Sequence, residues 1–199
     1  MIQTSSRTKN RRDTKQNKIM ENTFKKITDS QVSISELMLP SHSNFSGKIH
    51  GGYILNLMDQ IAFACASKHS RKYCVTASVD TVDFLNPIEV GELVTMKASI
   101  NYVGRSSMVV GIRVEAENIQ SGFVKHCNSS FFTMIAKDEN GKSTPVPGLI
   151  LENKNDIRRF MKCVQRAKMK KQRKQEFHET DFTSEKYVQH LKEYNVQIL

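Results

Sequence analysis

Residues 43–59 read SNFSGKIHGGYILNLMD, and the second half of this stretch begins the helix that decides the fold. After two adjacent glycines, Gly51 and Gly52, apolar residues recur at spacings of three and four, which is typical of a broad buried stripe on one helix. The residues of the stripe are Ile54, Leu55, Met58, Ile61, Ala62, Cys65 and Ala66. The pattern predicts a helix from Gly51 to about Lys68. Because this run is almost free of charge, we expect other elements to surround it.

Strand-like segments lie on both sides of the predicted helix. One precedes it, at residues 32–39, and ends at Pro40. Four follow it, separated by short turns, at residues 74–85, 93–103, 106–117 and 123–136. One strand, one long helix and four strands form an α+β order. It predicts an antiparallel five-stranded sheet wrapped around one long central helix.

The excess positive charge lies at the two ends of the chain. The net charge is +10, yet residues 31–149 hold ten Lys/Arg and ten Asp/Glu. We therefore predict three parts: a basic, disordered extension at 1–29, a folded domain at 30–148, and a basic, partly helical extension at 149–199. Because the predicted domain has no basic field of its own, no nucleic-acid partner is expected.

Composition also argues against membrane and metal-binding classes of protein. No stretch approaches the roughly 20 apolar residues that span a membrane, and the N-terminus lacks the apolar segment of a secretion signal. The four cysteines, Cys65, Cys74, Cys127 and Cys163, show no metal-ligand spacing and no disulfide pattern. We therefore expect a cytoplasmic protein without a membrane segment or a metal site.

Two features of the helix could carry chemistry. The N–H groups of Gly51 and Gly52 lie at the positive end of the helix dipole, where they could bind an oxyanion. Asp59 is the only ionisable side chain between Tyr53 and Ser67, at the edge of the apolar stripe. Poor solvation there would favour a general base that activates water. The alternative is a purely structural role for Asp59, as a capping or pairing residue.

The same stretch resembles a known signature. The pattern N-x-x-G-x-x-x-G-G runs from Asn44 to Gly52, and an uncharged run then leads to Asp59, fifteen residues after Asn44. It is similar to that of hotdog acyl-CoA thioesterases of the YciA and cytosolic acyl-CoA hydrolase type. Residues 78–92, with their F-x-x-P-x-x-x-G turn, and residues 103–108 (VGRSSM) are similar too. The resemblance covers roughly residues 32–136.

The resemblance implies a hotdog fold and hydrolysis of acyl-CoA to a free acid and coenzyme A. No separate cofactor is implied, because coenzyme A is part of the substrate. Asp59 would activate the water, Asn44 would orient the water or the thioester, and the N–H of Gly51 or Gly52 would bind the oxyanion. Asp59 would come from one chain and the helix tip from the other chain of a homodimer with shared active sites, with a trimer of dimers as the favoured assembly.

Further substrate-binding residues follow from the same resemblance. Arg105, Ser106 and Ser107 would lie near the pantetheine or nucleotide end of coenzyme A, and His50 would adjoin the site. Two alternatives stay open: an acyl-CoA-sensing module whose basic tails bind nucleic acid, and a dehydratase or isomerase that uses His50 and Asp59. The Asn44-to-Asp59 pattern fits a thioesterase better than either. The length of the preferred acyl chain cannot be predicted from these patterns.

Overall fold

The computed structural model describes residues 24–198. In chain order, its elements are β1 (Phe24–Lys26), η1 (Ile27–Ser30), β2 (Val32–Leu37), η2 (Pro40–His42), α2 (Gly51–Ser70), β3 (Tyr73–Val79), β4 (Leu93–Val103), β5 (Ser107–Asn118), β6 (Phe123–Lys137), β7 (Gly148–Ile150), α3 (Lys154–Glu179), α4 (Glu185–His190) and η3 (Leu191–Glu193). Within these residues, no helix is both long enough and apolar enough to cross a membrane.

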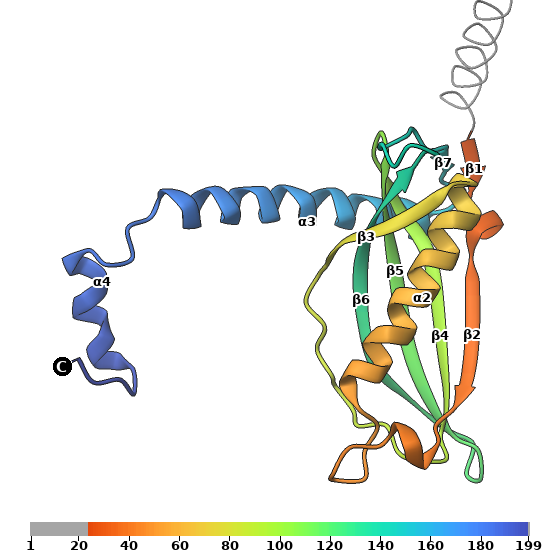
Figure 1. Ribbon diagram of the computed structural model, residues 1–199, viewed down its shortest axis with the longest axis horizontal. Helices are drawn as coiled ribbons and strands as arrows, with labels where there is room; N and C mark the ends of the chain where they lie inside the picture. The colour runs from red at the N-terminus through yellow and green to blue at the C-terminus, as the bar shows by residue number, and fades with distance from the viewer. Residues whose placement is uncertain (1–23, 199) are drawn as a thin grey trace, which may run out of the picture. The chain divides into compact units, whose positions relative to one another are not determined.

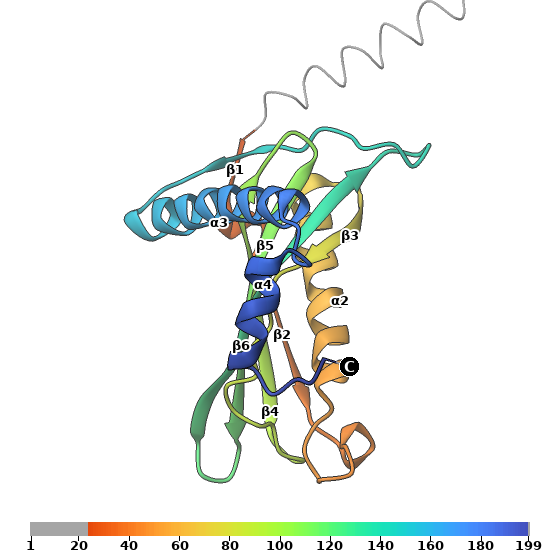
Figure 2. The same cartoon turned by 90° about the vertical axis from the view of Figure 1, so that its left-hand side faces the viewer.

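The main sheet has the order β2-β4-β5-β6-β3, and all its neighbouring strands are antiparallel. It curls around α2, which lies along the strands on the inner side of the curve (Figures 1 and 2). The predicted α+β architecture, a five-stranded antiparallel sheet wrapped around one long helix, is therefore confirmed.

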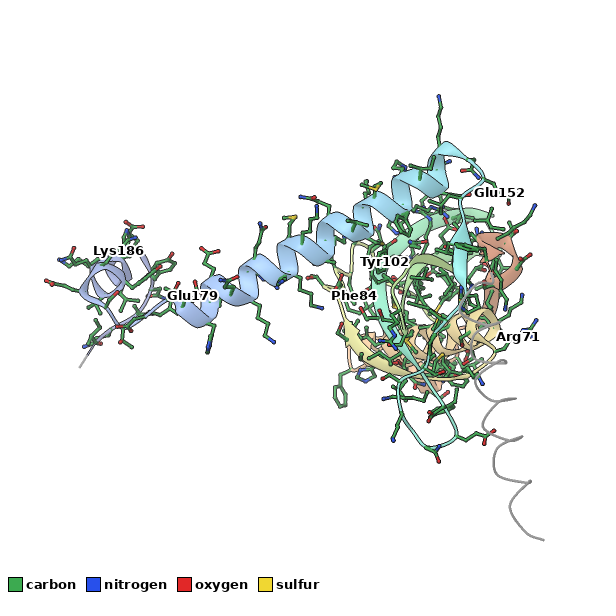
Figure 3. All side chains as sticks on the ribbon, turned by 90° about the horizontal axis from the view of Figure 1, so that it is seen from above. Arg71, Phe84, Tyr102, Glu152, Glu179 and Lys186 are labelled. Atoms are coloured by element: carbon green, nitrogen blue, oxygen red, sulfur yellow. The ribbon has the colours of Figure 1, made fainter. Side chains whose placement is uncertain are left out.

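The core forms where the inner face of the sheet meets α2. Alternate strand residues point inward, as Val94, Met96 and Ala98 do along β4. They pack against the apolar stripe of α2, in which Met58 and Cys65 are fully buried. Side chains fill the space between helix and sheet in the view from above (Figure 3). Each buried Met or Ile contributes about 1.5–3 kcal/mol relative to an exposed one, which holds α2 in place.

A buried histidine ties the C-terminal end of α2 to two other segments. His69 is fully buried, and its Nε2 donates to the carbonyl oxygen of Pro147 at 3.0 Å. Because Nε2 carries the proton of the neutral ring, Nδ1 accepts from the Ser30 hydroxyl at 2.9 Å. Burial, together with the nearby Lys25 ammonium, lowers the pKa of His69; the Pro147 hydrogen bond and Asp29 act in the opposite direction.

This lowered pKa predicts that acid weakens the fold. Below the ordinary histidine pKa of 6.5, the unfolded chain binds a proton that the folded chain does not. The free energy of unfolding therefore decreases as the pH is lowered. The loss continues until the pH reaches the lowered pKa of the folded state. Urea denaturation between about pH 8 and about pH 5 measures it. At the upper pH, His69→Gln should be about 1–3 kcal/mol less stable than wild type. On acidification its free energy of unfolding should decrease less than that of wild type. Equal losses in both proteins would contradict this account.

Some predicted boundaries were wrong. The predicted strand at 74–85 ends at Val79, after which the chain leaves the edge of the sheet and crosses toward the start of α2 as a loop. Two backbone hydrogen bonds, Asp80 N–H to Phe131 O and Leu85 N–H to Cys127 O, hold this loop against β6. The alternating apolar pattern continues through the loop, so periodicity alone could not show where the strand ends.

The folded part also begins before residue 30. Residues 1–23 of the predicted N-terminal extension lie outside the described part of the chain, but residues 24–29 form β1 and part of η1. β1 pairs in parallel with β7, with Phe24 opposite Gly148. Ile27 is buried, and Lys25 donates to the carbonyl oxygen of His69 at 2.6 Å. Three-residue strands are too short to show a periodicity, which is why the sequence did not reveal this pair.

The chain divides into two compact units, and the boundary lies between Met161 and Lys162, inside α3. In the first unit, the ring of Phe160 packs on Tyr102 of β4, with centroids 5.2 Å apart (Tyr102 is labelled in Figure 3). The second unit contains the rest of α3, then α4 and η3. In it, the rings of Phe177, Phe182 and Tyr187 form a chain of contacts with centroids 5.3 and 5.1 Å apart.

Candidate active site

A tight loop before α2 positions Asn44. The loop is closed by backbone hydrogen bonds from His50 N–H to His42 O and from Asn44 N–H to Lys48 O, at 2.9 and 2.6 Å. Gly47 lies at its turn with φ +76°, in the left-handed region that glycine adopts without strain. The Asn44 Oδ1 accepts three hydrogen bonds, from Ser46 N–H, Ser46 O–H and Lys48 N–H. Its carbonyl is therefore occupied, and its Nδ2 has no acceptor within residues 24–198.

The loop rests on an aromatic pair. The rings of His42 and Tyr53 are stacked, with centroids 4.0 Å apart and an interplanar angle of 20°. The Tyr53 hydroxyl donates to the carboxylate of Glu36 on β2, and this hydrogen bond raises the pKa of Tyr53. The contacts hold the first turn of α2 to the sheet, so the helix tip and the Asn44 loop are fixed relative to each other.

The tip of α2 presents free backbone donors. Tyr53 N–H and Ile54 N–H both donate to His50 O, at 3.0 and 3.3 Å. Within residues 24–198, the N–H groups of Gly51 and Gly52 have no backbone acceptor. His50 caps the helix through its backbone and is exposed, and its side chain makes no capping hydrogen bond. These N–H groups leave the helix tip able to donate to an anion, and their role in binding an oxyanion stays a prediction.

The two glycines differ in their surroundings. A Cβ added to Gly51 would lie 3.1 Å from the ring of Phe84, which comes from the loop after β3 (Phe84 is labelled in Figure 3). A Cβ on Gly52 would meet nothing within 4 Å. Gly51 is therefore needed for close packing inside the chain, whereas the space above Gly52 is open to another molecule.

Asp59 lies two turns further along α2, on the face that points toward the edge strand β3. Its carboxylate accepts a hydrogen bond from the Thr76 hydroxyl at 2.5 Å. The sequence predicted a poorly solvated carboxylate, but in the single chain Asp59 is exposed. The prediction was wrong for the isolated chain because β3 is the last strand of the sheet, and no strand of residues 24–198 lies along its outer side.

A pocket of about 560 Å³ lies beside this carboxylate, between α2 and β3. Its lining includes Asp59, Thr76 and the aromatic pair Phe63 and Tyr73, whose ring centroids are 5.6 Å apart. An exposed carboxylate beside an apolar wall suits a reaction in which water attacks a substrate with an apolar part. Sequence analysis did not identify Thr76, because one Thr in a strand carries no pattern, although its partner Asp59 was found.

The remaining predicted residues lie elsewhere in the chain. Arg105 and Ser106 lie in the turn between β4 and β5, and Ser107 is the first residue of β5. The carbonyl oxygens of Arg105 and Ser106 accept from the N–H groups of Val146 and Ala136, respectively. This turn is at the end of the sheet opposite to Gly51. The structure therefore brings Asn44, His50, Gly51 and Gly52 together, but it does not bring the β4–β5 turn to them within one chain.

Comparison with known proteins gives the family. Residues 46–123 match the family model described as "Thioesterase superfamily". YkhA of Bacillus subtilis, described as an uncharacterized acyl-CoA thioester hydrolase, is 36% identical over 146 residues, which are 73% of this chain and 85% of that protein. A structure of an apo-hexameric acyl-CoA thioesterase matches with a TM-score of 0.74 and 34% identity over 76% of this chain and 97% of that chain.

The acyl-CoA hydrolase of Staphylococcus aureus, solved with butyryl coenzyme A, coenzyme A and coenzyme A disulfide, matches with a TM-score of 0.72 and 28% identity. The match covers 85% of this chain and 99% of that chain. Further structures of that enzyme carry alanine in place of one aspartate, one threonine or one asparagine. From these sequence and structural matches, this chain belongs to the hotdog-fold thioesterase superfamily.

Proposed function

We propose that the protein is an acyl-CoA thioesterase, which hydrolyses acyl-CoA to a free carboxylic acid and coenzyme A. The observation that carries the proposal is the joint presence of free N–H donors at the tip of α2 and a carboxylate, Asp59, hydrogen-bonded to Thr76 beside an apolar pocket. Thioester hydrolysis needs both parts, an oxyanion site and a base for water. The relatives named above carry the same activity in their names.

The Staphylococcus aureus variants support the choice of residues. In that enzyme the substituted asparagine, aspartate and threonine are separated by 15 and 17 residues. The same spacings separate Asn44 from Asp59 and Asp59 from Thr76 in this chain. We assign water activation to Asp59 and orientation of its carboxylate to Thr76. Since the Oδ1 of Asn44 is already occupied, its Nδ2 is the group that can donate to the thioester carbonyl or the water.

The site needs two chains. Asp59 lies eight residues after Gly51 on the helix, which is about 12 Å along the axis, whereas the attacking water must lie within about 3 Å of both the base and the reacting carbon. We propose a homodimer in which the partner's Asp59 faces the Gly52 tip of this chain. The outer edge of β3, along which no other strand of residues 24–198 lies, is the proposed interface, since it is flanked by exposed aromatic rings, Tyr73 at 65% and Phe63 at 40% exposure.

A larger assembly would give the β4–β5 turn its predicted role. In a trimer of dimers, a neighbouring chain can supply Arg105, Ser106 and Ser107 to the coenzyme A moiety of a substrate bound at the helix tip. The hexameric state of a matching thioesterase supports this arrangement. We also propose that the enzyme needs no added cofactor and works in the cytoplasm, where buried free thiols such as Cys65, Cys74 and Cys127 stay reduced.

A thiol-release assay with acyl-CoAs of several chain lengths tests the proposed activity. We expect release of coenzyme A with at least one chain length, and no binding of random duplex DNA by the full chain in a parallel assay. DNA binding without thiol release would favour the sensing module with nucleic-acid-binding tails. Hydration of an enoyl-CoA without thiol release would favour the dehydratase.

Gly52→Val tests the oxyanion site. A Cβ at this position meets nothing within 4 Å in residues 24–198, so the thermal midpoint should stay close to that of wild type. Turnover should fall by about 10²-fold or more, because the branched side chain stands where the substrate must approach the backbone. Gly122→Ala, in the distant β5–β6 hairpin at φ +69°, is the opposite control: the strained backbone should lower its thermal midpoint, but its turnover should stay that of wild type. A folded Gly52→Val protein with normal turnover would exclude the helix tip as the oxyanion site.

Thr76 offers a matched pair of substitutions. Thr76→Val keeps the shape of the side chain but removes the hydroxyl that holds the Asp59 carboxylate, so kcat should fall by about tenfold or more. Thr76→Ser keeps the hydroxyl and should restore most of the activity. Steady-state kinetics on both variants measures the difference. Equal activity of the two variants would show that the hydrogen bond does not position the base.

A further inference from the structure

A second pocket, of about 570 Å³, lies on the outer face of the sheet, on the side away from α2. One cross-strand row of its lining runs Ser33, Lys97, Arg113 and Ser129, through β2, β4, β5 and β6. The residues next to this row on the same strands, such as Ala98 beside Lys97 and Ile112 beside Arg113, point into the core. Arg159, from the first turns of α3, completes the rim. The proposed thioesterase site uses none of these residues.

The next row makes the pocket deep. Ser99, Gly111 and Phe131 are neighbours on β4, β5 and β6. A Cβ on Gly111 would lie 2.2 Å from the Nδ2 of Asn101, so the Asn101 amide occupies the place of a side chain. Asn101 is only 6% exposed, and its Oδ1 accepts from the Ser99 hydroxyl at 3.0 Å. No hydrogen bond joins its Nδ2 to another group of residues 24–198, and Asn101 lines the pocket, so this amide can donate to a molecule bound there.

The rim carries surplus positive charge. Glu115 accepts from Lys97 Nζ and from Arg113 Nε, both at 2.8 Å, and these two hydrogen bonds lower the pKa of Glu115. One carboxylate thus faces two cations. Glu115 engages Arg113 through Nε, so the two terminal guanidinium nitrogens of Arg113 remain available to bind a ligand. Arg159 has no ion-pair partner in the described part of the chain. Two unit charges are therefore uncompensated at the rim of a pocket whose lining is mainly apolar, with the Ser99 hydroxyl and the Asn101 amide as polar groups.

We propose that this pocket binds a phosphate-bearing small molecule. Guanidinium groups match phosphate oxygens in geometry, and the serine hydroxyls and the Asn101 amide supply further donors to the same oxygens. The volume is within the range of about 300–1,000 Å³ for small-molecule sites and exceeds what one phosphate fills. The ligand is thus an organic phosphate, which could be a free nucleotide or the nucleotide end of coenzyme A.

Isothermal titration calorimetry on the full chain tests the proposal. Three probes are titrated at up to about 1 mM: inorganic pyrophosphate, ADP and 3′-phosphoadenosine 5′-diphosphate. We expect saturable binding of at least one probe, weakened about tenfold or more in Arg159→Ala and in Arg113→Gln. Tighter binding of 3′-phosphoadenosine 5′-diphosphate than of ADP would identify the coenzyme A end as the ligand; the reverse order would identify a free nucleotide.

Two controls separate this pocket from the helix tip. Lys142→Ala removes a cation from the exposed turn after β6 and should bind the probes as wild type does. Gly52→Val alters the helix tip and should leave the calorimetric binding unchanged. The proposal is overturned if no probe binds, or if Arg159→Ala and Arg113→Gln both bind the probes as tightly as wild type does, whatever the result for Gly52→Val. Since calorimetry needs no turnover, a failed thioesterase assay would leave this test intact.

Discussion

Replacing Asp59 with Asn is expected to lower the kcat of acyl-CoA hydrolysis by about 10²–10⁴-fold. Asparagine has the shape of aspartate and can still accept the Thr76 hydrogen bond, but it cannot take a proton from water. The pocket beside it should therefore keep its form, and acyl-CoA should bind with nearly unchanged affinity. Thiol release under single-turnover conditions measures the chemical step, and calorimetry with a non-hydrolysable acyl-CoA thioether measures the binding.

Glu139→Gln is the matched control for this substitution. It removes one carboxylate from the exposed turn after β6, far from α2 in sequence and outside the proposed site. Its turnover should equal that of wild type. If Asp59→Asn were as active as Glu139→Gln, the base would have to be another group, and the assignment of Asp59 would fail.

Much of the fold could be predicted because the periodicities are long. The helix at Gly51–Ser70 and the strands at Leu93–Val103 and Phe123–Lys137 each carry a clear apolar pattern over ten or more residues. The β1–β7 pair and the true end of β3 could not be predicted. The first is held by contacts between residues more than 120 positions apart in sequence, and the second is decided by where the chain leaves the sheet edge.

Only those site residues that lie in one continuous stretch of sequence could be predicted. Asn44, Gly51, Gly52 and Asp59 stand in one continuous stretch, so their spacing can be read from the sequence. Thr76 comes from a neighbouring strand and is identified only through its hydrogen bond to Asp59. The predicted poor solvation of Asp59 does not hold in a single chain, because β3 is the last strand of the sheet in residues 24–198; in the proposed dimer, a second copy across this edge would cover Asp59.

Mixing two inactive variants tests whether the active site is shared. Asn44→Ala and Asp59→Ala proteins are combined under conditions that exchange single chains. If the partner's Asp59 serves the helix tip of this chain, each mixed dimer has one intact site of two. Random pairing makes half of the dimers mixed, so recovery should approach about a quarter of wild-type activity. Exchange is followed independently by mass spectrometry with one isotope-labelled variant.

The most direct measurement adds the reciprocal mixture, wild type with the Asn44→Ala, Asp59→Ala double variant in equal amounts. In a shared site every mixed dimer is inactive, so the total activity should fall on exchange from about half to about a quarter of that of an all-wild-type sample. A shared site thus predicts a gain of activity in the mixture of the two single variants and a loss of activity in the mixture of wild type with the double variant. No recovery in the first and no loss in the second, despite proven exchange, would mean that each chain carries a complete site of its own.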